Sequence, residues 1–265
     1  MKLKFDSTLD YQQEAIAAVR DVFKGQTAKQ SLFTVTAVDE QLSLLDEFSA
    51  PQQLALGQGI GNRLGLDQED LLKNIREVQI RHGLPQSSAL GNEINLDIEM
   101  ETGTGKTYVY LRTLLELNKA YGFTKFIIVV PSIAIKEGVK KTIDITREHF
   151  RGIYSNVNYD AFVYDSDHIE KIRDFATAND IQIMVITIDA FQKSSAARHI
   201  SKPWAMAQPS CRWMILESLY RAFEKRHPKR DAVPIHTITH SGLMRLTASE
   251  RGGIICFLRD MTPGR

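Results

Sequence analysis

The sequence is poor in cysteine and contains no long apolar run. Cys211 and Cys256 are its only cysteines and lie 45 positions apart, which leaves neither a disulfide framework nor a four-thiolate metal site. The longest apolar stretch, around 126–130, is far too short to cross a bilayer, and MKLKFDSTLD at 1–10 lacks the apolar segment of a signal peptide. We therefore expect free thiols, a cytoplasmic location and no membrane partner.

Net charge is also nearly absent, at +1, but the charges are unevenly placed along the chain. Residues 1–193 carry 21 Lys and Arg against 27 Asp and Glu, whereas residues 194–265 carry 12 against 5, so the two parts have net charges of −6 and +7. The second part also holds both tryptophans and five of the eight prolines. This change of composition indicates either a basic segment that binds nucleic acid or a stretch translated in a shifted reading frame.

The first part contains a regular alternation of helix and strand patterns. Apolar residues at helical spacing predict a helix from Asp10 to Gly25 and another from Asp67 to Gly83, with each aspartate as the cap, and the turn-rich stretch 26–66 is interpreted as a loop or insertion. Short apolar strands separated by helices of about 10 to 15 residues are typical of a parallel sheet with helices on both faces. The predicted strands are 94–100, 126–130, 161–164 and 181–188, and the predicted helices between them are 106–120, 133–150 and 167–178.

TGTGKT follows one predicted strand and precedes a helix. Gly103 and Gly105 let the backbone approach a phosphate chain closely, and the amides of the loop and of the helix start favour negative charge. Lys106 is placed to reach the β- and γ-phosphates, and the hydroxyl of Thr107 to bind Mg²⁺. A glycine-rich turn without a ligand is the alternative, but the strand before and the helix after favour a phosphate-binding loop. We predict that a nucleoside triphosphate and Mg²⁺ are bound there by Thr102, Gly103, Thr104, Gly105, Lys106 and Thr107.

The segment METGTGKTYVYLRTLLELNKAYGFTKFIIVVPSIAIKEGVKK at 100–141 resembles the restriction (Res) subunit of type III restriction-modification systems, a superfamily two helicase-like enzyme. Met100 stands where the longer phosphate-loop pattern has its first glycine, as is common in helicase-type loops. The resemblance covers most of residues 1–193 and implies a RecA-like motor domain. It also implies ATP-dependent translocation on double-stranded DNA, cleavage by a C-terminal nuclease of the PD-(D/E)xK type, and a complex with the methyltransferase (Mod) subunit.

The resemblance also assigns a base-contacting residue. LDYQQEAI at 9–16 is similar to the family's upstream glutamine motif, which implies that Gln12 contacts the adenine. A surface glutamine on an amphipathic helix is the alternative.

Two further segments are similar to DNA-contacting motifs of the family. PSIAIKEGVKK is similar to motif Ia, which implies that Pro131 and Ser132 contact the DNA backbone, and an ordinary strand-to-helix turn is the alternative. VITIDAF offers Thr187 as a third DNA contact, although threonine is common in strands.

Hydrolysis of ATP needs an acidic pair at the end of another strand and an arginine from a second domain. In the family the acidic motif reads DEPQ or DExH, and no such motif is found here. WMILESL at 213–219 is an apolar run with Glu217 near its end, but no aspartate precedes that residue. His236 and His240 have the spacing of metal ligands on a helix, yet the β-branched residues between them favour a strand. The basic run 221–230 is either a phosphate contact or a solvated surface.

We therefore expect an α/β, RecA-like motor domain with an incomplete sheet over 1–193, and a basic tail of unknown or frameshifted origin over 194–265. The expected function is that of the N-terminal fragment of a Res subunit, which binds ATP, Mg²⁺ and DNA with Lys106 as its catalytic residue. ATP hydrolysis and DNA cleavage are not expected without the missing parts. The alternatives are a remnant that binds DNA or the Mod subunit without hydrolysis, and a small P-loop kinase, which would need an acceptor site and an arginine-rich lid.

Overall fold

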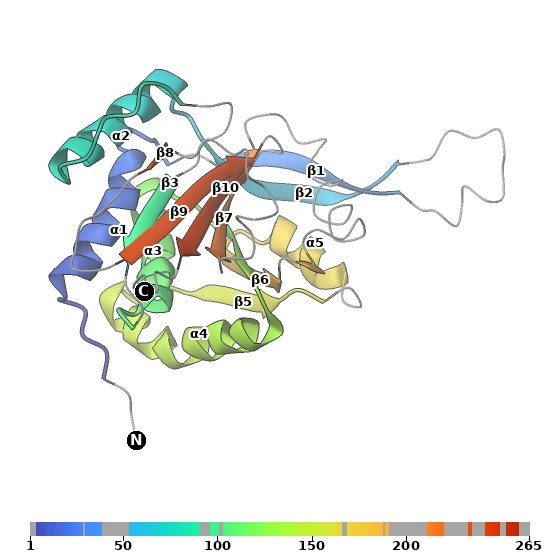
Figure 1. Ribbon diagram of the computed structural model, residues 1–265. Coiled ribbons are helices and arrows are strands. Elements are labelled where there is room, and N and C mark those ends of the chain that lie inside the picture. The colour runs from blue at the N-terminus through green and yellow to red at the C-terminus, as the bar shows by residue number, and fades with distance from the viewer. Residues whose placement is uncertain are drawn as a thin grey trace.

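A computed structural model describes residues 4–28, 30–38, 53–90, 96–100, 103–165, 169–187, 189–190, 211–219, 233–234, 242–249 and 253–259 (Figure 1). The helices are α1 (Asp10–Val22), α2 (Gln68–Arg81), α3 (Lys106–Tyr121), α4 (Ile133–Ile153) and α5 (Ile169–Thr177). The strands are β1 (Gln30–Val38), β2 (Gln53–Arg63), β3 (Leu96–Met100), β4 (Lys125–Val130), β5 (Tyr159–Val163), β6 (Ile181–Thr187), β7 (Cys211–Leu219), β8 (Val233–Pro234), β9 (Gly242–Ser249) and β10 (Gly253–Arg259).

The strands form one sheet of order β5-β6-β4-β7-β10-β9-β3-β8, with β2 paired to β7 and β1 paired to β2. β5, β6 and β4 are parallel neighbours, and β4 and β6 are buried along almost their whole length. Crossovers between parallel strands are right-handed. α4 leads from β4 to β5 in one direction along the sheet, and α5 leads from β5 back to β6 in the other direction. The two helices therefore cover opposite faces of the sheet. α3 crosses in the same direction as α4 and contacts it. The fold is therefore the α/β, RecA-like arrangement that the sequence predicts.

Two predicted helix caps have different outcomes. The carboxylate of Asp67 accepts a hydrogen bond from the backbone N–H of Asp70 at 2.8 Å, which confirms it as the cap of α2. Asp10 was expected to cap α1, and this prediction was wrong, because Asp10 is already the first helical residue and Leu9 occupies the cap position without a side-chain hydrogen bond. In the first turn the Asp10 carboxylate still interacts favourably with the helix dipole.

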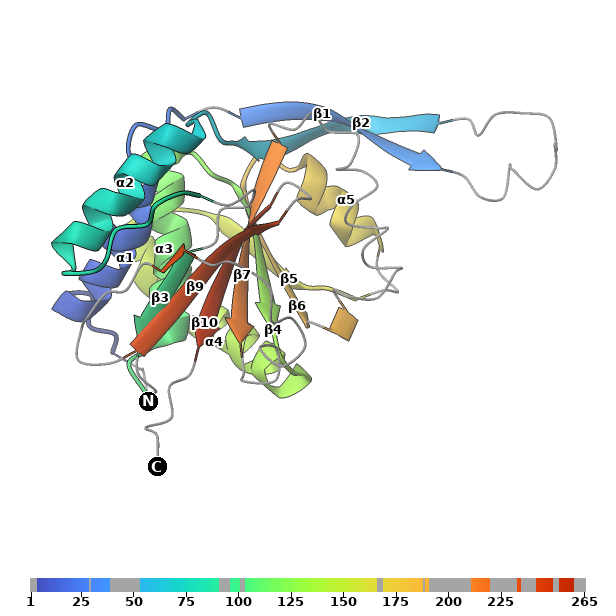
Figure 2. The same ribbon diagram turned by 45° about the horizontal axis from the view of Figure 1, so that its top comes forward.

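The prediction that 26–66 is a loop or insertion also needs correction, because the segment contains the antiparallel strands β1 and β2. Their register runs from the pair Gln30 and Asn62 to the pair Val38 and Gln53. Figures 1 and 2 show the two strands as a ribbon that passes beside α5 and projects away from the other helices of the body. The sequence gives β2 only a weak strand pattern, because glycine at 57, 59 and 61 lowers its strand propensity. In the structure, pairing with β1 satisfies the hydrogen-bonding groups of its backbone.

Buried amide side chains fasten the root of this ribbon to the sheet. Asn62 accepts hydrogen bonds from the backbone N–H groups of Thr124 and Lys125 at 2.7 and 3.1 Å, and its Nδ2 donates to the carbonyl of Lys125 at 2.8 Å. Gln26 similarly joins the two ends of the ribbon, since it donates to the carbonyl of Arg63 and accepts from the N–H of Gly65, both at 2.8 Å. The orientation of the ribbon is thus tied to the start of β4.

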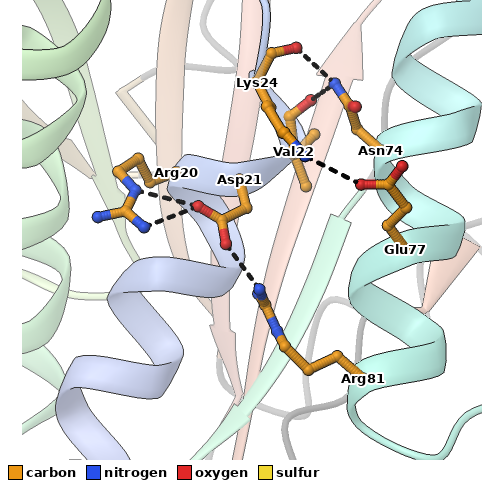
Figure 3. Close-up of polar contacts among 7 residues, drawn as sticks. All are labelled: Arg20, Asp21, Val22, Lys24, Asn74, Glu77 and Arg81. Atoms are coloured by element: carbon orange, nitrogen blue, oxygen red, sulfur yellow. Dashed lines mark hydrogen bonds and ion pairs between the residues drawn. The ribbon is translucent and has the colours of Figure 1, made fainter.

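α2 is attached to the end of α1 by side-chain contacts (Figure 3). Asn74 of α2 donates from Nδ2 to the carbonyls of Val22 and Lys24 at 3.0 and 2.8 Å, which satisfies acceptors left open where α1 ends. Asp21 of α1 forms an ion pair with Arg81 of α2 at 2.8 Å. Because Asn74 is buried, its two hydrogen bonds contribute more to this attachment than the exposed ion pair.

Strands from both sides of the predicted boundary at Lys193 belong to the same sheet. β7 lies between β4 and β10, while β3 pairs with β8, β9 and β10, so the strand partners of β3 come from the basic part of the chain. The His236–His240 pair and the basic run 221–230 lie outside the described residues. Within the part of the chain that is described, no helix combines the length and apolar character needed to cross a membrane.

Candidate functional site

The predicted phosphate loop joins the end of β3 to the start of α3. Gly103 and Gly105 have φ angles of +85° and +82°, a left-handed conformation that favours glycine. At Gly103 a Cβ would meet nothing within 4 Å, but at Gly105 it would lie 3.0 Å from Nε2 of Gln12. Gly105 is therefore required both by its backbone conformation and by the close approach of Gln12. Thr102, the first predicted residue of the loop, lies outside the described residues.

Lys106 and Thr107 begin α3 and are both partly exposed. Nζ of Lys106 donates to the carbonyl of Met100 at 3.3 Å, so this hydrogen bond joins the two ends of the loop between β3 and α3. The first turn of α3 contains no acidic residue. The N-terminus of α3 therefore combines the positive end of a helix dipole with a nearby ammonium, which is an arrangement that favours an anion.

Gln12, from α1, lies against this loop rather than on the surface. Its side chain is 5% exposed, and its Nε2 donates to the carbonyl of Thr104 at 2.9 Å. The hydroxyl of Tyr11 donates to the same carbonyl at 3.3 Å and accepts from Nε2 of Gln12 at 3.4 Å. The structure thus brings Gln12 and the loop together and adds Tyr11, which the sequence reasoning missed although it directly precedes Gln12.

The orientation of the Gln12 amide follows from its neighbours. A backbone carbonyl can only accept a hydrogen bond, so the amide atom that faces Thr104 must be the nitrogen. Oε1 of Gln12 is then left buried and has no hydrogen-bond partner in the described part of the structure. Since a buried, unpaired acceptor is unfavourable, this atom is suited to a ligand that brings an N–H donor.

An aromatic cluster packs beside the start of α3. The rings of Phe5 and Tyr108 are stacked with centroids 5.9 Å apart, and the hydroxyl of Tyr108 lies 2.9 Å from Nε2 of His149. Burial, followed by the positive charge of Arg112, lowers the pKa of His149, which favours the neutral imidazole. Arg112 also donates to the carbonyl of Ser7 at 2.7 Å, which holds the segment before α1 against α3. Apolar spacing in the sequence gave no signal for this cluster, because its members come from three separate segments.

The three predicted DNA contacts lie at the carboxyl ends of neighbouring strands. Pro131 and Ser132 follow β4, Thr187 ends β6, and Val130 is paired in register with Thr187. The hydroxyl of Ser132 caps α4 by accepting from the N–H of Ile135 at 3.4 Å. The structure brings these three residues to one edge of the sheet, and β7, β10 and β9 separate them from the phosphate loop in strand order.

β7 carries the apolar run in which no acidic pair was expected. It is parallel to β4, and the backbone of Glu217 is paired in register with Val129, close to the same edge of the sheet. Among the residues with described side chains, no group of three or more His, Cys, Asp and Glu is arranged to hold a metal ion.

The α/β fold described above, with its glycine loop between β3 and α3, defines the chain as a RecA-like domain. The chain matches the model of the family described as "Type III restriction enzyme, res subunit" over residues 6–225. Because this match covers well over half of its length, the chain belongs to that family. The matched region continues past Lys193 and includes β7.

Curated relatives carry the same description. The chain is 33% identical over 156 residues to the type III restriction-modification enzyme EcoPI Res subunit of Escherichia phage P1, which is 57% of this chain and 14% of that protein. It is 42% identical over 95 residues to the EcoP15I Res subunit of Escherichia coli, which is 34% of this chain and 10% of that protein. It is 52% identical over 67 residues to the StyLTI Res subunit of Salmonella typhimurium. The chain therefore spans only a small part of the length of these relatives.

Proposed function

We propose that this chain is the nucleotide-binding part of the helicase-like motor of a Res subunit, and that it binds ATP with Mg²⁺ between α1 and the loop before α3. The observation that carries the proposal is the buried, unpaired Oε1 of Gln12 beside the glycine loop. The 6-amino group of adenine is an N–H donor of the kind that this acceptor lacks. The triphosphate would extend from there to the N–H groups of the loop and to Lys106.

The loop also fits a magnesium–phosphate complex. Mg²⁺ in nucleotide sites is held by few protein ligands and otherwise by water and phosphate oxygens. The hydroxyl of Thr107 would be the protein ligand, and Lys106 would neutralise the phosphate charge that the ion does not contact. Because the sequence shows no DEPQ or DExH motif, we expect the residues of this chain to bind and orient the nucleotide rather than to activate water.

The base-recognition step is tested by comparing ATP with ITP, in which an oxygen replaces the 6-amino group. Oε1 of Gln12 would then face a second acceptor, so we expect ITP to bind at least about tenfold more weakly, which corresponds to about 1.4 kcal/mol. Gln12→Ala should remove most of this discrimination. Gln13→Ala is the matched control, because Gln13 is exposed and donates to the carbonyl of Ser7 rather than to the glycine loop. Equal affinities of the unmodified chain for ATP and ITP would contradict the proposal.

We further propose that DNA binds at the edge formed by Pro131, Ser132 and Thr187, and that the complete motor works with a Mod subunit. Membership of the Res family supports both points. Short hydroxyl side chains and helix N-termini are suitable phosphate contacts, which supports the choice of this edge.

Neither ATP turnover nor DNA cleavage is proposed for the chain by itself. Measurement of ATPase activity with and without double-stranded DNA tests this statement. Robust turnover that disappears in Lys106→Ala would contradict it and would direct attention to Glu217 on β7, whose backbone lies at the carboxyl edge of the sheet.

A further inference from the structure

Arg112 is a buried arginine in the middle of α3 that takes no direct part in the proposed nucleotide site. Its side chain is only 7% exposed, and it lies six residues beyond Lys106, which is about 9 Å along the helix axis. None of the ion pairs within the described part of the chain includes Arg112. Burial of a charge without a counter-charge is unfavourable, so apolar packing does not explain an arginine at this position.

The guanidinium donates to two oxygens that belong to other segments of the chain. Nη1 donates to the backbone carbonyl of Ser7 at 2.7 Å, and Nε donates at 3.3 Å to the hydroxyl of Tyr154, the residue directly after α4. The hydroxyl of Tyr154 in turn donates to Oε1 of Glu116 at 2.8 Å. Because the nitrogens of a guanidinium are fixed in one plane, the two bonds together set the position of Ser7 relative to α3 and the end of α4.

Neither oxygen depends on Arg112 alone for its hydrogen bonding. The carbonyl of Ser7 also accepts from Nε2 of Gln13 at 2.5 Å, and the hydroxyl of Tyr154 keeps its bond to the Glu116 carboxylate. The bond from Gln13 joins Ser7 to α1, whereas the bond from Arg112 joins Ser7 to α3. Replacement of Arg112 would therefore break the connection to α3 without leaving either oxygen unpartnered.

Ser7 is firmly connected to the start of α1, which carries Gln12. The N–H and the hydroxyl of Thr8 donate to Oδ1 of Asp6 at 2.8 and 2.6 Å, so the chain around Ser7 forms a compact turn. A displacement of this turn relative to α3 is transmitted to the first turn of α1. Nε2 of Gln12 lies 2.9 Å from the carbonyl of Thr104, a distance that permits little movement before the hydrogen bond is lost.

We propose that Arg112 is a positioning residue that holds the start of α1 against α3 and thereby sets the selectivity of the site for adenine. This inference rests on the proposed recognition of the 6-amino group by Oε1 of Gln12. Arg112 contacts neither base nor phosphate in this arrangement, because it acts through Ser7 and the first turn of α1. A displaced amide no longer presents Oε1 to the base, so loss of Arg112 should reduce the preference for ATP over ITP.

Arg147 on α4 provides a matched control. It also donates from Nη1 to a backbone carbonyl at 2.7 Å, that of Tyr159, and its guanidinium lies 4.7 Å from the centroid of the same tyrosine ring. This arginine connects α4 to β5, so its replacement removes the same kind of hydrogen bond away from the start of α1. Methionine at either position keeps an unbranched side chain but has no N–H donor.

The experiment measures the affinities of the full chain for ATP and for ITP by calorimetric titration in the presence of Mg²⁺. In the unmodified protein ATP should bind at least about tenfold more tightly. We expect this ratio to fall to about two- to threefold in Arg112→Met, mainly through weaker binding of ATP, and to be unchanged in Arg147→Met. In a chain that already carries Gln12→Ala, Arg112→Met should have no further effect on either affinity, because the contact through which it acts is absent.

The outcomes separate this inference from the function on which it rests. Equal affinities of the unmodified chain for ATP and ITP would overturn the recognition of the base, and the role of Arg112 with it. If the unmodified chain discriminates and Arg112→Met discriminates equally well, recognition by Gln12 stands and the role of Arg112 is overturned. Equal weakening of both nucleotides that persists in the Gln12→Ala chain would also overturn it, because this result indicates a general loss of structure.

Tyr154→Phe decides the question if Arg112→Met does not fold. This substitution removes only the hydroxyl that accepts from Nε of Arg112, while the bond to Ser7 can still form. A ratio of ATP to ITP affinity reduced by about twofold would support the positioning role. An unchanged ratio would contradict it.

Discussion

Gly105→Ala tests the contact between α1 and the glycine loop more directly than any other single change. The substitution has two separable effects, because the new methyl group must accommodate a φ of +82° and would lie 3.0 Å from Nε2 of Gln12. Gly103→Ala is its matched control. That position has nearly the same φ, +85°, but a methyl group there would meet nothing within 4 Å.

The magnitudes follow from these two differences. A left-handed conformation at alanine costs about 1–2 kcal/mol, so this is the full expected loss of stability in Gly103→Ala. In Gly105→Ala the methyl group also displaces the Gln12 amide from the carbonyl of Thr104, which removes a 2.9 Å hydrogen bond worth about 1 kcal/mol. The expected loss is therefore about 2–3 kcal/mol, and the difference between the two variants measures the contact with Gln12.

Urea unfolding of five chains decides the matter: the unmodified protein, Gly103→Ala, Gly105→Ala, Gln12→Ala and the double variant with alanine at 12 and 105. If the methyl group acts through Gln12, the extra loss in Gly105→Ala disappears when Gln12 is already alanine, and the two substitutions are not additive. Equal losses in Gly103→Ala and Gly105→Ala, or strict additivity in the double variant, would refute the reasoning.

Three further predictions concern the framework of the site. Asn74→Ala should lower the free energy of unfolding by about 1–3 kcal/mol, because two carbonyls at the end of α1 lose their donor; Lys24→Ala, which breaks an exposed ion pair, should change it by at most about 0.5 kcal/mol. Burial lowers the pKa of Lys125 from 10.5 to about 8. The charged lysine therefore destabilises the folded state below pH 8, and this destabilisation disappears as the pH rises toward 10.5. Measured by urea unfolding relative to Lys125→Met, the free energy of unfolding of the unmodified chain should rise by roughly 2–3 kcal/mol over that range. A chain ending at Lys193 should lose ATP binding, measured by titration, because β3 would lose the strands paired with it; retained ATP affinity would show that residues 1–193 form the domain alone.

The sequence was most informative where side-chain chemistry and local pattern coincide. Residues 126–130 form an unbroken apolar run, and β4 is indeed buried on both faces. The glycine pattern of TGTGKT predicted a loop with unusual backbone angles, and the structure has positive φ at both glycines that it describes. In these segments the structure depends on the local sequence, so neighbouring residues are sufficient to predict it.

The parts that could not be predicted depend on contacts between distant segments. β2 lacks a strong strand pattern, and its partner β1 ends at Val38, well before β2 begins at Gln53, so the pairing cannot be inferred from neighbouring residues. The role of Tyr11 depends on a carbonyl 93 residues away. Asn74 resembles any polar residue of an amphipathic helix until its position beneath the end of α1 is known. A single sequence contains no signal for such pairs, because each partner is unremarkable in its own neighbourhood.

The position of α1 determines the geometry of the proposed nucleotide site. Its first turns carry Gln12 and Tyr11, which hold the carbonyl of Thr104, while its last turn is held by Asn74 of α2. A shift of α1 along its axis would therefore move the Gln12 amide and the glycine loop together. Because hydrogen bonds hold both ends of the helix, we expect the proposed recognition of the base to be coupled to the conformation of the loop. Asn74→Ala should consequently weaken ATP affinity even though Asn74 is far from the loop, and Lys24→Ala should not.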